Sequence, residues 1–356
     1  MSVSLHSKSS PLIWSIGRQA ARIIEQNGFD ARQIDLMIGA SGGPKWLVLS
    51  GLDRALYSDF IFQREAELPT VASSIGSWRF ACMALKDPLQ GLDRFIEAYL
   101  TQQYTSESTI EDISATLNAI LSCLLGEQGA SEILSHRFLR NHIVTIRSKG
   151  LLKYRHKLGL ALGLGQSFLM NLIQPRWLSL TCERVVFGDG RMSPLMFNDA
   201  LPSRPVSLTE ANLELALRAS GSVPMALEGV ENIPQAPPGM YRDGGVTDYH
   251  FNARLGRGKG LIFYPHFYAH CVPGWFDKGL KSRHQSESDW DNLIMVSPSP
   301  AFVDGLPYRK IPDRKDFFKL SDVERVPYWR RVVAESERLG EAFLDAVRTQ
   351  QFGLRA

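Results

Sequence analysis

The sequence has few cysteines and no pattern that would put them to use. Its 356 residues include four, Cys82, Cys123, Cys182 and Cys271, which lie far apart without a CxxC pair. A zinc site, a redox-active pair or a disulfide scaffold needs closely spaced cysteines. We therefore expect reduced, mostly buried thiols, and a functional site with no metal and no cofactor.

An excess of charge of one sign is also lacking. Lys and Arg number 40 and Asp and Glu 37, and the basic residues are spread along the chain, so the net charge of +3 gives no reason to expect a nucleic-acid partner. Residues 1–24 contain no apolar core followed by a small-residue cleavage site. No apolar stretch is long enough to cross a bilayer. We expect a cytoplasmic protein without a signal peptide or a transmembrane span.

Short apolar runs alternate with segments of helical periodicity along most of the chain. Strands are predicted at 34–40, 69–74, 142–148, 180–188, 261–267 and 292–297, and helices at 16–27, 45–62, 77–87, 89–103, 108–125, 208–220 and 321–349. This alternation favours a largely parallel sheet covered by helices. A chain of this length can fill one α/β core with insertions, so one domain over 1–356 is expected.

Residues 158–173 form the most apolar stretch of the chain. Basic residues flank it, at Lys149, Lys153, Arg155, Lys157 and Arg176. Two interpretations remain open: a buried helix or cap element, or an interfacial surface that contacts lipid or lines an acyl pocket. On the second interpretation, residues 149–176 make a peripheral membrane contact.

The first candidate for chemistry is the segment AlaSerSerIleGlySer at 72–77, where a β-rich run meets a helix. A sharp strand-to-helix turn lifts a serine hydroxyl above the sheet, and small residues two positions to either side avoid clashes. Ala72 and Gly76 supply this around Ser74. The competing Ser77 is flanked by larger residues, so Ser74 is preferred as the nucleophile. Because the helix begins just after Ser74, the N–H of Ile75 can stabilise developing negative charge.

Two further segments could complete such a site. GlyAlaSerGlyGlyProLys at 39–45 again joins a strand to a helix, and its glycines allow backbone N–H groups to approach an oxyanion. The segment has neither the GK[ST] ending of a phosphate-binding loop nor the GxGxxG spacing of a dinucleotide site. AspGlyGly at 243–245 can hold a carboxylate in a turn, free to approach another loop. Each segment alone is also consistent with an ordinary tight turn.

Together, and in this order, the three segments resemble the patatin-like phospholipase family. That family has a glycine-rich oxyanion loop, a GxSxG elbow and a DGG or DGA motif, used as a Ser-Asp dyad without histidine. Residues 217–230 also look like the family segment that precedes the acidic motif. The resemblance implies a three-layer α/β/α, mostly parallel sheet with a core at about 34–300, a helical insertion at about 89–176 and a C-terminal helix at about 321–349.

The resemblance also implies roles for individual residues. Ser74 would be the nucleophile and Asp243 its base, while Gly42, Gly43, Lys45 and Ile75 would bind the oxyanion or substrate. The sequence departs from the family pattern: Ala72, Ser41 and Trp46 replace glycines, and Lys45 stands where arginine is usual. The bulky Trp46 is expected either to close down the entrance or to alter how the loop meets substrate.

The expected function is therefore hydrolysis of ester-linked acyl chains, as in a phospholipase A, through an acyl-enzyme. The partner would be a lipid or another acyl ester. Two alternatives remain: a thioesterase or acyltransferase that uses the same dyad, and a catalytically silent protein that binds lipid or regulates another process.

Overall fold

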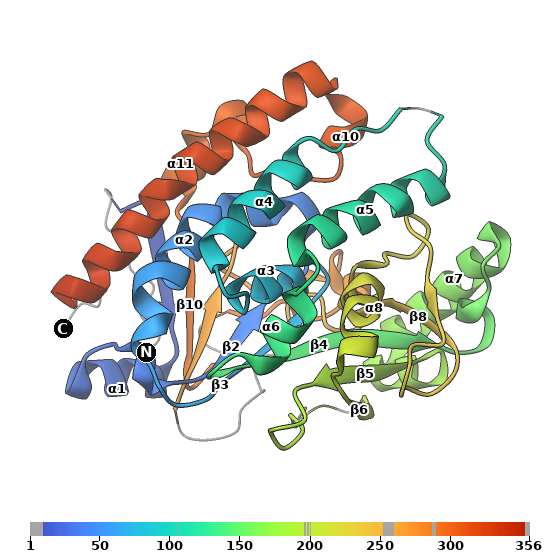
Figure 1. Ribbon diagram of the computed structural model, residues 1–356, viewed down its shortest axis with the longest axis horizontal. Helices are drawn as coiled ribbons and strands as arrows, with labels where there is room; N and C mark the ends of the chain where they lie inside the picture. The colour runs from blue at the N-terminus through green and yellow to red at the C-terminus, as the bar shows by residue number, and fades with distance from the viewer. Residues whose placement is uncertain are drawn as a thin grey trace.

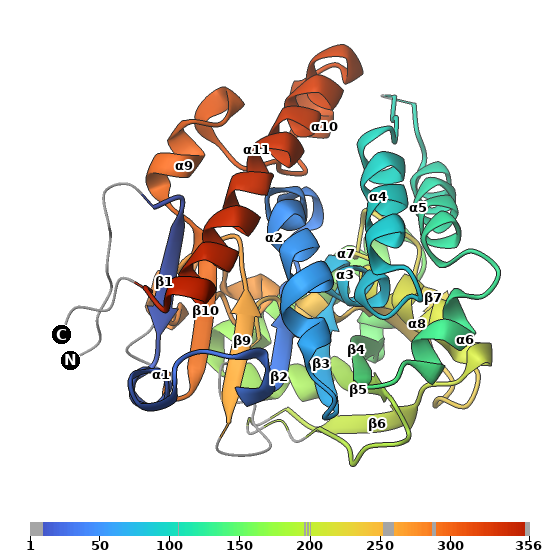
Figure 2. The ribbon, with the colours of Figure 1, turned by 60° about the vertical axis from the view of Figure 1, so that its left-hand side comes forward.

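A computed structural model of the chain has a mostly parallel sheet at its centre, with helices on both faces (Figures 1 and 2). It describes residues 10–105, 107–195, 197, 199, 201–251, 260–286 and 290–352. The strand order is β1-β10-β9-β2-β3-β4-β5-β6, and β8 pairs with both β7 and β4. The predicted three-layer α/β/α class is confirmed.

The strands are β1 (Leu12–Ile16), β2 (Ile34–Gly39), β3 (Leu68–Ser73), β4 (Leu139–Ser148), β5 (Cys182–Gly188), β6 (Ser203–Ser207), β7 (Val230–Glu231), β8 (Met240–Asp243), β9 (Leu261–Pro265) and β10 (Leu293–Pro298). The α-helices are α1 (Arg18–Asn27), α2 (Ser50–Ala55), α3 (Ile75–Met83), α4 (Pro88–Leu100), α5 (Ile110–Leu125), α6 (Gly129–Ser135), α7 (Lys157–Ile173), α8 (Glu210–Gly221), α9 (Pro300–Asp304), α10 (Asp316–Lys319) and α11 (Asp322–Thr349).

The middle of the sheet consists of strands that are buried on both faces. β3 is buried along its whole length and β2 along nearly all of it, as expected for parallel strands covered by helices. Met37 of β2 lies opposite Thr70 of β3 in parallel register. One hydrophobic cluster contains side chains from Leu12 to Phe352. We therefore propose that the chain forms one domain.

Several sequence predictions need correction. The first strand is β1 rather than β2; β1 pairs antiparallel with β10, and its five buried residues show no alternation that would identify it. The single helix predicted at 45–62 is divided into η2 (Gly43–Leu49), α2, η3 (Leu56–Phe60) and η4 (Ile61–Gln63). Residues 89–176 are not purely a helical insertion, because β4 lies in the centre of the sheet between β3 and β5. β6, β7 and β8 lie outside all of the predicted strands.

β4 has an unusual set of neighbours. β5 pairs antiparallel with β4 from His142 to Ser148 and occupies one edge along that length. The other edge is shared: β3 pairs parallel with β4 as far as Val144, and β8 pairs antiparallel with it from Thr145 onward. β3 and β8 therefore run toward each other along the same edge and end at adjacent positions of β4.

The long helix α11 packs across the N-terminal half of the fold, against α2 (Figure 2). The hydroxyl of Ser336 accepts a hydrogen bond from the N–H of Gly51 at 2.9 Å and also contacts the hydroxyl of Ser50 at 2.9 Å. A Cβ on Gly51 would lie 2.2 Å from the carbonyl oxygen of Ser336, and one on Gly340 would lie 2.4 Å from the carbonyl oxygen of Gly51. Two glycines thus permit this close contact between helices.

We expect Gly51→Ala to destabilise the protein by about 1–3 kcal/mol, because the new methyl group overlaps the backbone of α11. The matched control is Gly165→Ala in α7, where a Cβ meets no atom within 4 Å. That change should stabilise the protein by about 0.5–1 kcal/mol through helix propensity. Urea unfolding of both variants measures the difference, and equal effects at the two positions would contradict the packing argument.

Candidate active site

Ser74 lies at the sharp junction between β3 and α3. Its φ of 54° is in the left-handed region, which a residue other than glycine rarely adopts. Such strain costs on the order of 1–3 kcal/mol and is typical of nucleophile elbows. A Cβ on Gly76 would lie 2.6 Å from the carbonyl of Gly39 on β2, so the elbow can form only with glycine at this position. Ser74 itself is only 4% exposed.

Hydrogen bonds fix the backbone of this elbow. The N–H of Ser74 donates to the hydroxyl of Ser220 at 2.8 Å, and that hydroxyl donates to the carbonyl of Val144 at 2.7 Å. Ser77 donates to the carbonyl of Ala72 at 2.9 Å, across the same turn. The hydroxyl of Ser77 is therefore used in holding the turn.

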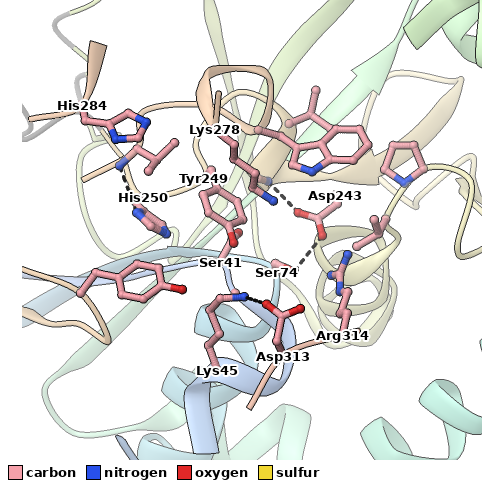
Figure 3. A pocket seen from close by; sticks show the side chains of 18 of the residues that line it. Ser41, Lys45, Ser74, Asp243, Tyr249, His250, Lys278, His284, Asp313 and Arg314 are labelled. Atoms are coloured by element: carbon pink, nitrogen blue, oxygen red, sulfur yellow. Dashed lines mark hydrogen bonds and ion pairs between the residues drawn. The ribbon is translucent and has the colours of Figure 1, made fainter. Parts of the chain in front are cut away.

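Asp243 ends β8 and faces Ser74 directly. The Ser74 hydroxyl donates to Oδ2 of Asp243 at 2.7 Å, and the N–H of Gly245 donates to Oδ1 at 2.7 Å (Figure 3). Both carboxylate oxygens thus have a donor, although Asp243 is only 5% exposed. A Cβ on Gly244 would lie 2.2 Å from the carbonyl oxygen of Val144, so this glycine allows the turn to pass over β4.

The glycine-rich segment after β2 closes the site from the other side. Its backbone is anchored by the N–H of Ser41, which donates to the carbonyl of Tyr249 at 2.9 Å, and by the Ser41 hydroxyl, 2.7 Å from that of Ser73. Gly42 lines the same pocket as Ser74, and a Cβ there would lie 2.6 Å from the ring of Phe267. Gly43 begins η2 with a φ of +56°.

Of the four residues predicted to bind the oxyanion or substrate, two line the pocket and two do not. Gly42 and Lys45 line the pocket, and the ammonium group of Lys45 binds the carboxylate of Asp313. Gly43 and Ile75 are not pocket-lining residues. Their N–H groups belong to the first residue of η2 and of α3 respectively, where an N–H has no acceptor within its own helix.

The expectation for Trp46 is wrong. Its side chain is fully buried and stacks on Phe95, with the ring centroids 4.3 Å apart and an angle of 10° between the planes. Trp46 is therefore part of the core beneath the loop and does not narrow the entrance. The sequence could not show this, because residues of an irregular helix point to either side.

The dyad lies in a pocket of about 600 Å³, a volume common for small-ligand sites. Its walls combine apolar and charged groups from both ends of the chain. The apolar lining comes from Val223, Pro224, Val246, Val272 and Trp275, and the charged lining from Lys45, Asp243, Lys278, Asp313, Arg314 and Lys315. Figure 3 shows Lys278 and Arg314 approaching the dyad from different segments.

Positive charge predominates in this pocket, with four cations against two carboxylates. Lys45 is paired with Asp313, whereas Lys278, Arg314 and Lys315 have no ion-pair partner within the described residues. The ammonium of Lys278 lies 3.9 Å from the ring centroid of Tyr249, a cation-π contact. An anionic group entering the pocket would meet these cations.

The environment shifts two pKa values in directions that matter for chemistry. Burial raises the pKa of Asp243, and the hydrogen bond from Ser74 and the charge of Arg314 oppose this only in part. The residue Lys278 is exposed as a whole, but its ammonium end points into the pocket (Figure 3). Desolvation there, together with Arg314 and Lys45, lowers the pKa of Lys278 to about 7.

Three histidines also line the pocket, His250, His270 and His284, and the contacts of His250 are with groups other than Ser74 and Asp243. Nδ1 of His250 accepts a hydrogen bond from the N–H of Val272 at 3.0 Å, and its ring packs on that of His266. Burial lowers the pKa of His250 well below its ordinary value. Among the described residues, no group of three or more His, Cys, Asp or Glu side chains is arranged to hold a metal.

Sequence reasoning missed four residues that belong to this site: Ser220, Lys278, Asp313 and Arg314. Ser220 could have been found, because it lies in the 217–230 segment that resembles the family pattern. Lys278, Asp313 and Arg314 lie in irregular segments with no motif. Their contact with the dyad depends on tertiary structure alone.

Comparison with known proteins adds little to this description. No family model matches the chain, and no curated protein matches it in sequence. Among solved structures the chain resembles VipD from Legionella pneumophila, with 11% identity and a TM-score of 0.32. The match covers 74% of this chain and 52% of the VipD chain, so this chain spans about half the length of that protein. At this TM-score the likeness supports no functional conclusion.

We expect Ser220→Ala to cost about 1–3 kcal/mol of stability, since it leaves the buried N–H of Ser74 without its acceptor. Urea unfolding measures this cost. Ser131→Ala, at an exposed serine of α6, is the control and should stay within about 0.5 kcal/mol of wild type. If Ser220→Ala proved as stable as the control, the hydrogen bond would not hold the elbow.

Proposed function

We propose that this protein is a serine acyl hydrolase with Ser74 as nucleophile and Asp243 as base. The observation that carries the proposal is the 2.7 Å hydrogen bond from the Ser74 hydroxyl to Asp243, at a strained strand-to-helix junction within a pocket. Backbone strain at a serine that meets a carboxylate has no evident structural benefit, whereas such strain is typical of a nucleophile elbow.

The reaction would proceed in two halves. Asp243 accepts the Ser74 proton as Oγ attacks the acyl carbonyl, and the protonated carboxyl then gives that proton to the departing alkoxide. The same carboxylate next takes a proton from water, whose oxygen attacks the acyl-enzyme, and returns it to Ser74 Oγ as the acid is released. One ester and one water give one alcohol and one acid.

The oxyanion of each tetrahedral intermediate would be held by the N–H groups of Gly42, Gly43 and Ile75. The N–H groups of Gly43 and Ile75 belong to the first residues of η2 and α3 and lack an intrahelical acceptor, and Gly42 borders the pocket. Removing one such donor typically costs about 3 kcal/mol of transition-state stabilisation. Lys45 is paired with Asp313, so it would act on the substrate as part of this ion pair and not as a free cation.

The substrate would be an acyl ester that also carries a negative charge. Val223, Val246 and Trp275 offer apolar contacts to an acyl chain, and Lys278 and Arg314 can bind an acidic group. A phospholipid satisfies both requirements, and it is also the substrate that the patatin-like resemblance implies. The membrane contact expected from residues 149–176 would bring the pocket to such a substrate.

Replacing the nucleophile tests the proposal directly. Ser74→Ala should lower kcat for a chromogenic acyl ester by about 10³-fold or more, and should abolish labelling by a fluorophosphonate. Asp243→Asn should behave in the same way. Ser77→Ala is the matched control and should still be labelled. Undiminished labelling of Ser74→Ala would refute the assignment, and a folded wild-type protein that takes no label would favour the catalytically silent alternative.

Comparison of substrates then distinguishes the remaining enzyme classes. A hydrolase of phospholipid-like esters should have a higher kcat/KM for an anionic acyl ester than for a neutral ester of the same chain length. A thioesterase would prefer the matching acyl thioester. An acyltransferase would release less free acid when an acceptor alcohol is added.

The pH dependence should reflect both shifted groups. Activity requires ionised Asp243, so kcat/KM should rise with pH through the raised pKa of Asp243. Lys278→Met removes a nearby cation, so it should move this acidic limb to still higher pH. It should also raise KM for an anionic ester about tenfold below pH 7, where Lys278 is charged, and less above pH 7.

The control for this profile is Lys86→Met, at an exposed lysine outside the pocket. This change should leave both the acidic limb and KM unaltered. If Lys278→Met matched that control, Lys278 would have no part in binding or in the ionisation of Asp243.

A further inference from the structure

Helix α7 has its apolar side chains on the outside. Among the described residues, ten of the fourteen large hydrophobic side chains that are strongly exposed fall between residues 151 and 180. Leu158, Leu162, Leu169 and Ile173 recur at helical spacing and form one stripe, with exposures between 56% and 71%. With Leu172 and Trp177 they form what we call the α7 patch. Figure 1 shows α7 at one end of the molecule, remote from α1 and α11.

Apart from Leu160, the buried residues of α7 are small or polar. A Cβ on Gly163 would lie 2.5 Å from the N–H of Leu152, so the helix packs closely on the preceding segment. Ser167 donates to the hydroxyl of Thr181 at 2.9 Å, and the amide of Asn171 donates to Asp277 at 2.8 Å. These buried hydrogen bonds fix the rotation of the helix, so it cannot turn its leucines inward.

The chain segment that carries the patch has charges of one sign only. Residues 149–182 include five Lys and Arg residues and no Asp or Glu. Arg155 forms an ion pair with Glu231, while Lys153, Lys157 and Arg176 are exposed and have no ion-pair partner within the described part of the chain. An exposed apolar face bordered by basic residues is typical of a helix that lies at an anionic membrane surface.

The patch is also joined to the wall of the pocket. The 3₁₀ turn η8 (Trp275–Asp277) contributes Trp275 to the pocket lining, and the next residue, Phe276, packs against Phe168 of α7 with ring centroids 6.3 Å apart. Asp277 holds α7 through Asn171. The surface that carries the patch therefore borders the site.

We propose that the α7 patch docks on an anionic lipid surface, with its leucines and Trp177 inserted among the acyl chains and the flanking cations at the headgroups. A second copy of the chain is a poorer occupant, because pairing two such faces would bring unopposed positive charges together. No described helix is long and apolar enough to cross a membrane, so the contact would be peripheral. Delivery of substrate from that surface rests on the proposed function, but docking does not.

The test uses the full chain carrying Ser74→Ala, so that vesicles stay intact. It should co-sediment with phosphatidylcholine vesicles that contain phosphatidylserine, bind more weakly to phosphatidylcholine alone, and dissociate as salt is added. Adding Leu162→Glu and Leu169→Glu should weaken binding by about tenfold or more. The matched control adds Phe318→Glu and Val323→Glu, which change two apolar residues outside the patch that are even more exposed, and this variant should bind like the parent chain.

A second variant tests the contribution of the basic residues. Lys157→Glu with Arg176→Glu should abolish the preference for phosphatidylserine, since each cation near such a surface contributes about fivefold in affinity. The proposal fails if the parent chain binds neither kind of vesicle, or if the double leucine variant binds as well as the parent. It also fails if the chain is a dimer in the absence of lipid and the same leucine changes make it a monomer, because the patch is then a subunit interface.

Activity separates this proposal from the proposed function. With Ser74 intact, the double leucine variant should hydrolyse a soluble short-chain ester as fast as wild type does. It should hydrolyse an ester embedded in vesicles at about a tenth of the wild-type rate on the same vesicles, or less. Loss of both activities, with an unaltered melting temperature, would contradict a role restricted to docking. If neither ester is cleaved even by wild type while vesicle binding persists, the proposed function fails and the docking surface stands.

Discussion

The shared edge of β4 is the constraint on which the candidate site depends. β3 and β8 approach each other along this edge and stop beside Val144 and Thr145, which brings Asp243, the last residue of β8, close to Ser74, the residue that follows β3. A serine and an aspartate 169 positions apart are placed within hydrogen-bonding distance by strand pairing, not by a flexible loop. The glycines at 76 and 244 are consequences of this arrangement, since each lies where another backbone leaves no space for a Cβ.

The sequence predicted those parts of the site that local sterics determine. Ser74 was preferred over Ser77 from the size of the flanking residues, and the structure shows Ser74 rather than Ser77 bonded to Asp243. Lys278 and Arg314 could not be predicted, since their proximity depends on how irregular segments pack. The prediction for Trp46 was wrong for the same reason. The residue type shows that the side chain is large, but the direction of the side chain is set by its packing on Phe95. For the fold, buried runs such as β2 and β3 were evident, whereas short β1 and β8 had no periodic signal.

A buried ion pair stabilises the segment that follows Asp243. Arg184 of β5 binds both carboxylate oxygens of Asp248 at 2.7 Å, five residues after Asp243, and the pair is almost fully buried. The carbonyl of Asp248 accepts a hydrogen bond from Ser73, next to Ser74. Breaking such a pair typically costs about 3–5 kcal/mol, because the remaining charge is left without a partner. The segment after Asp243 is thus fixed to both β3 and β5, which limits how far the carboxylate can drift from Ser74.

The packing of α11 on α2 has a consequence for the order of events during synthesis. Ser74 and Asp243 are both made before α11, and so are Asp313 and Arg314, which line the pocket just ahead of it. However, the glycine-rich loop leads through η2 into α2, and α2 is held by Ser336 and Gly340 of α11. A nascent chain that already contains Ser74 and Asp243, but not α11, would therefore still lack the support for the glycine-rich loop. The loop would gain this support only once α11 has left the ribosome.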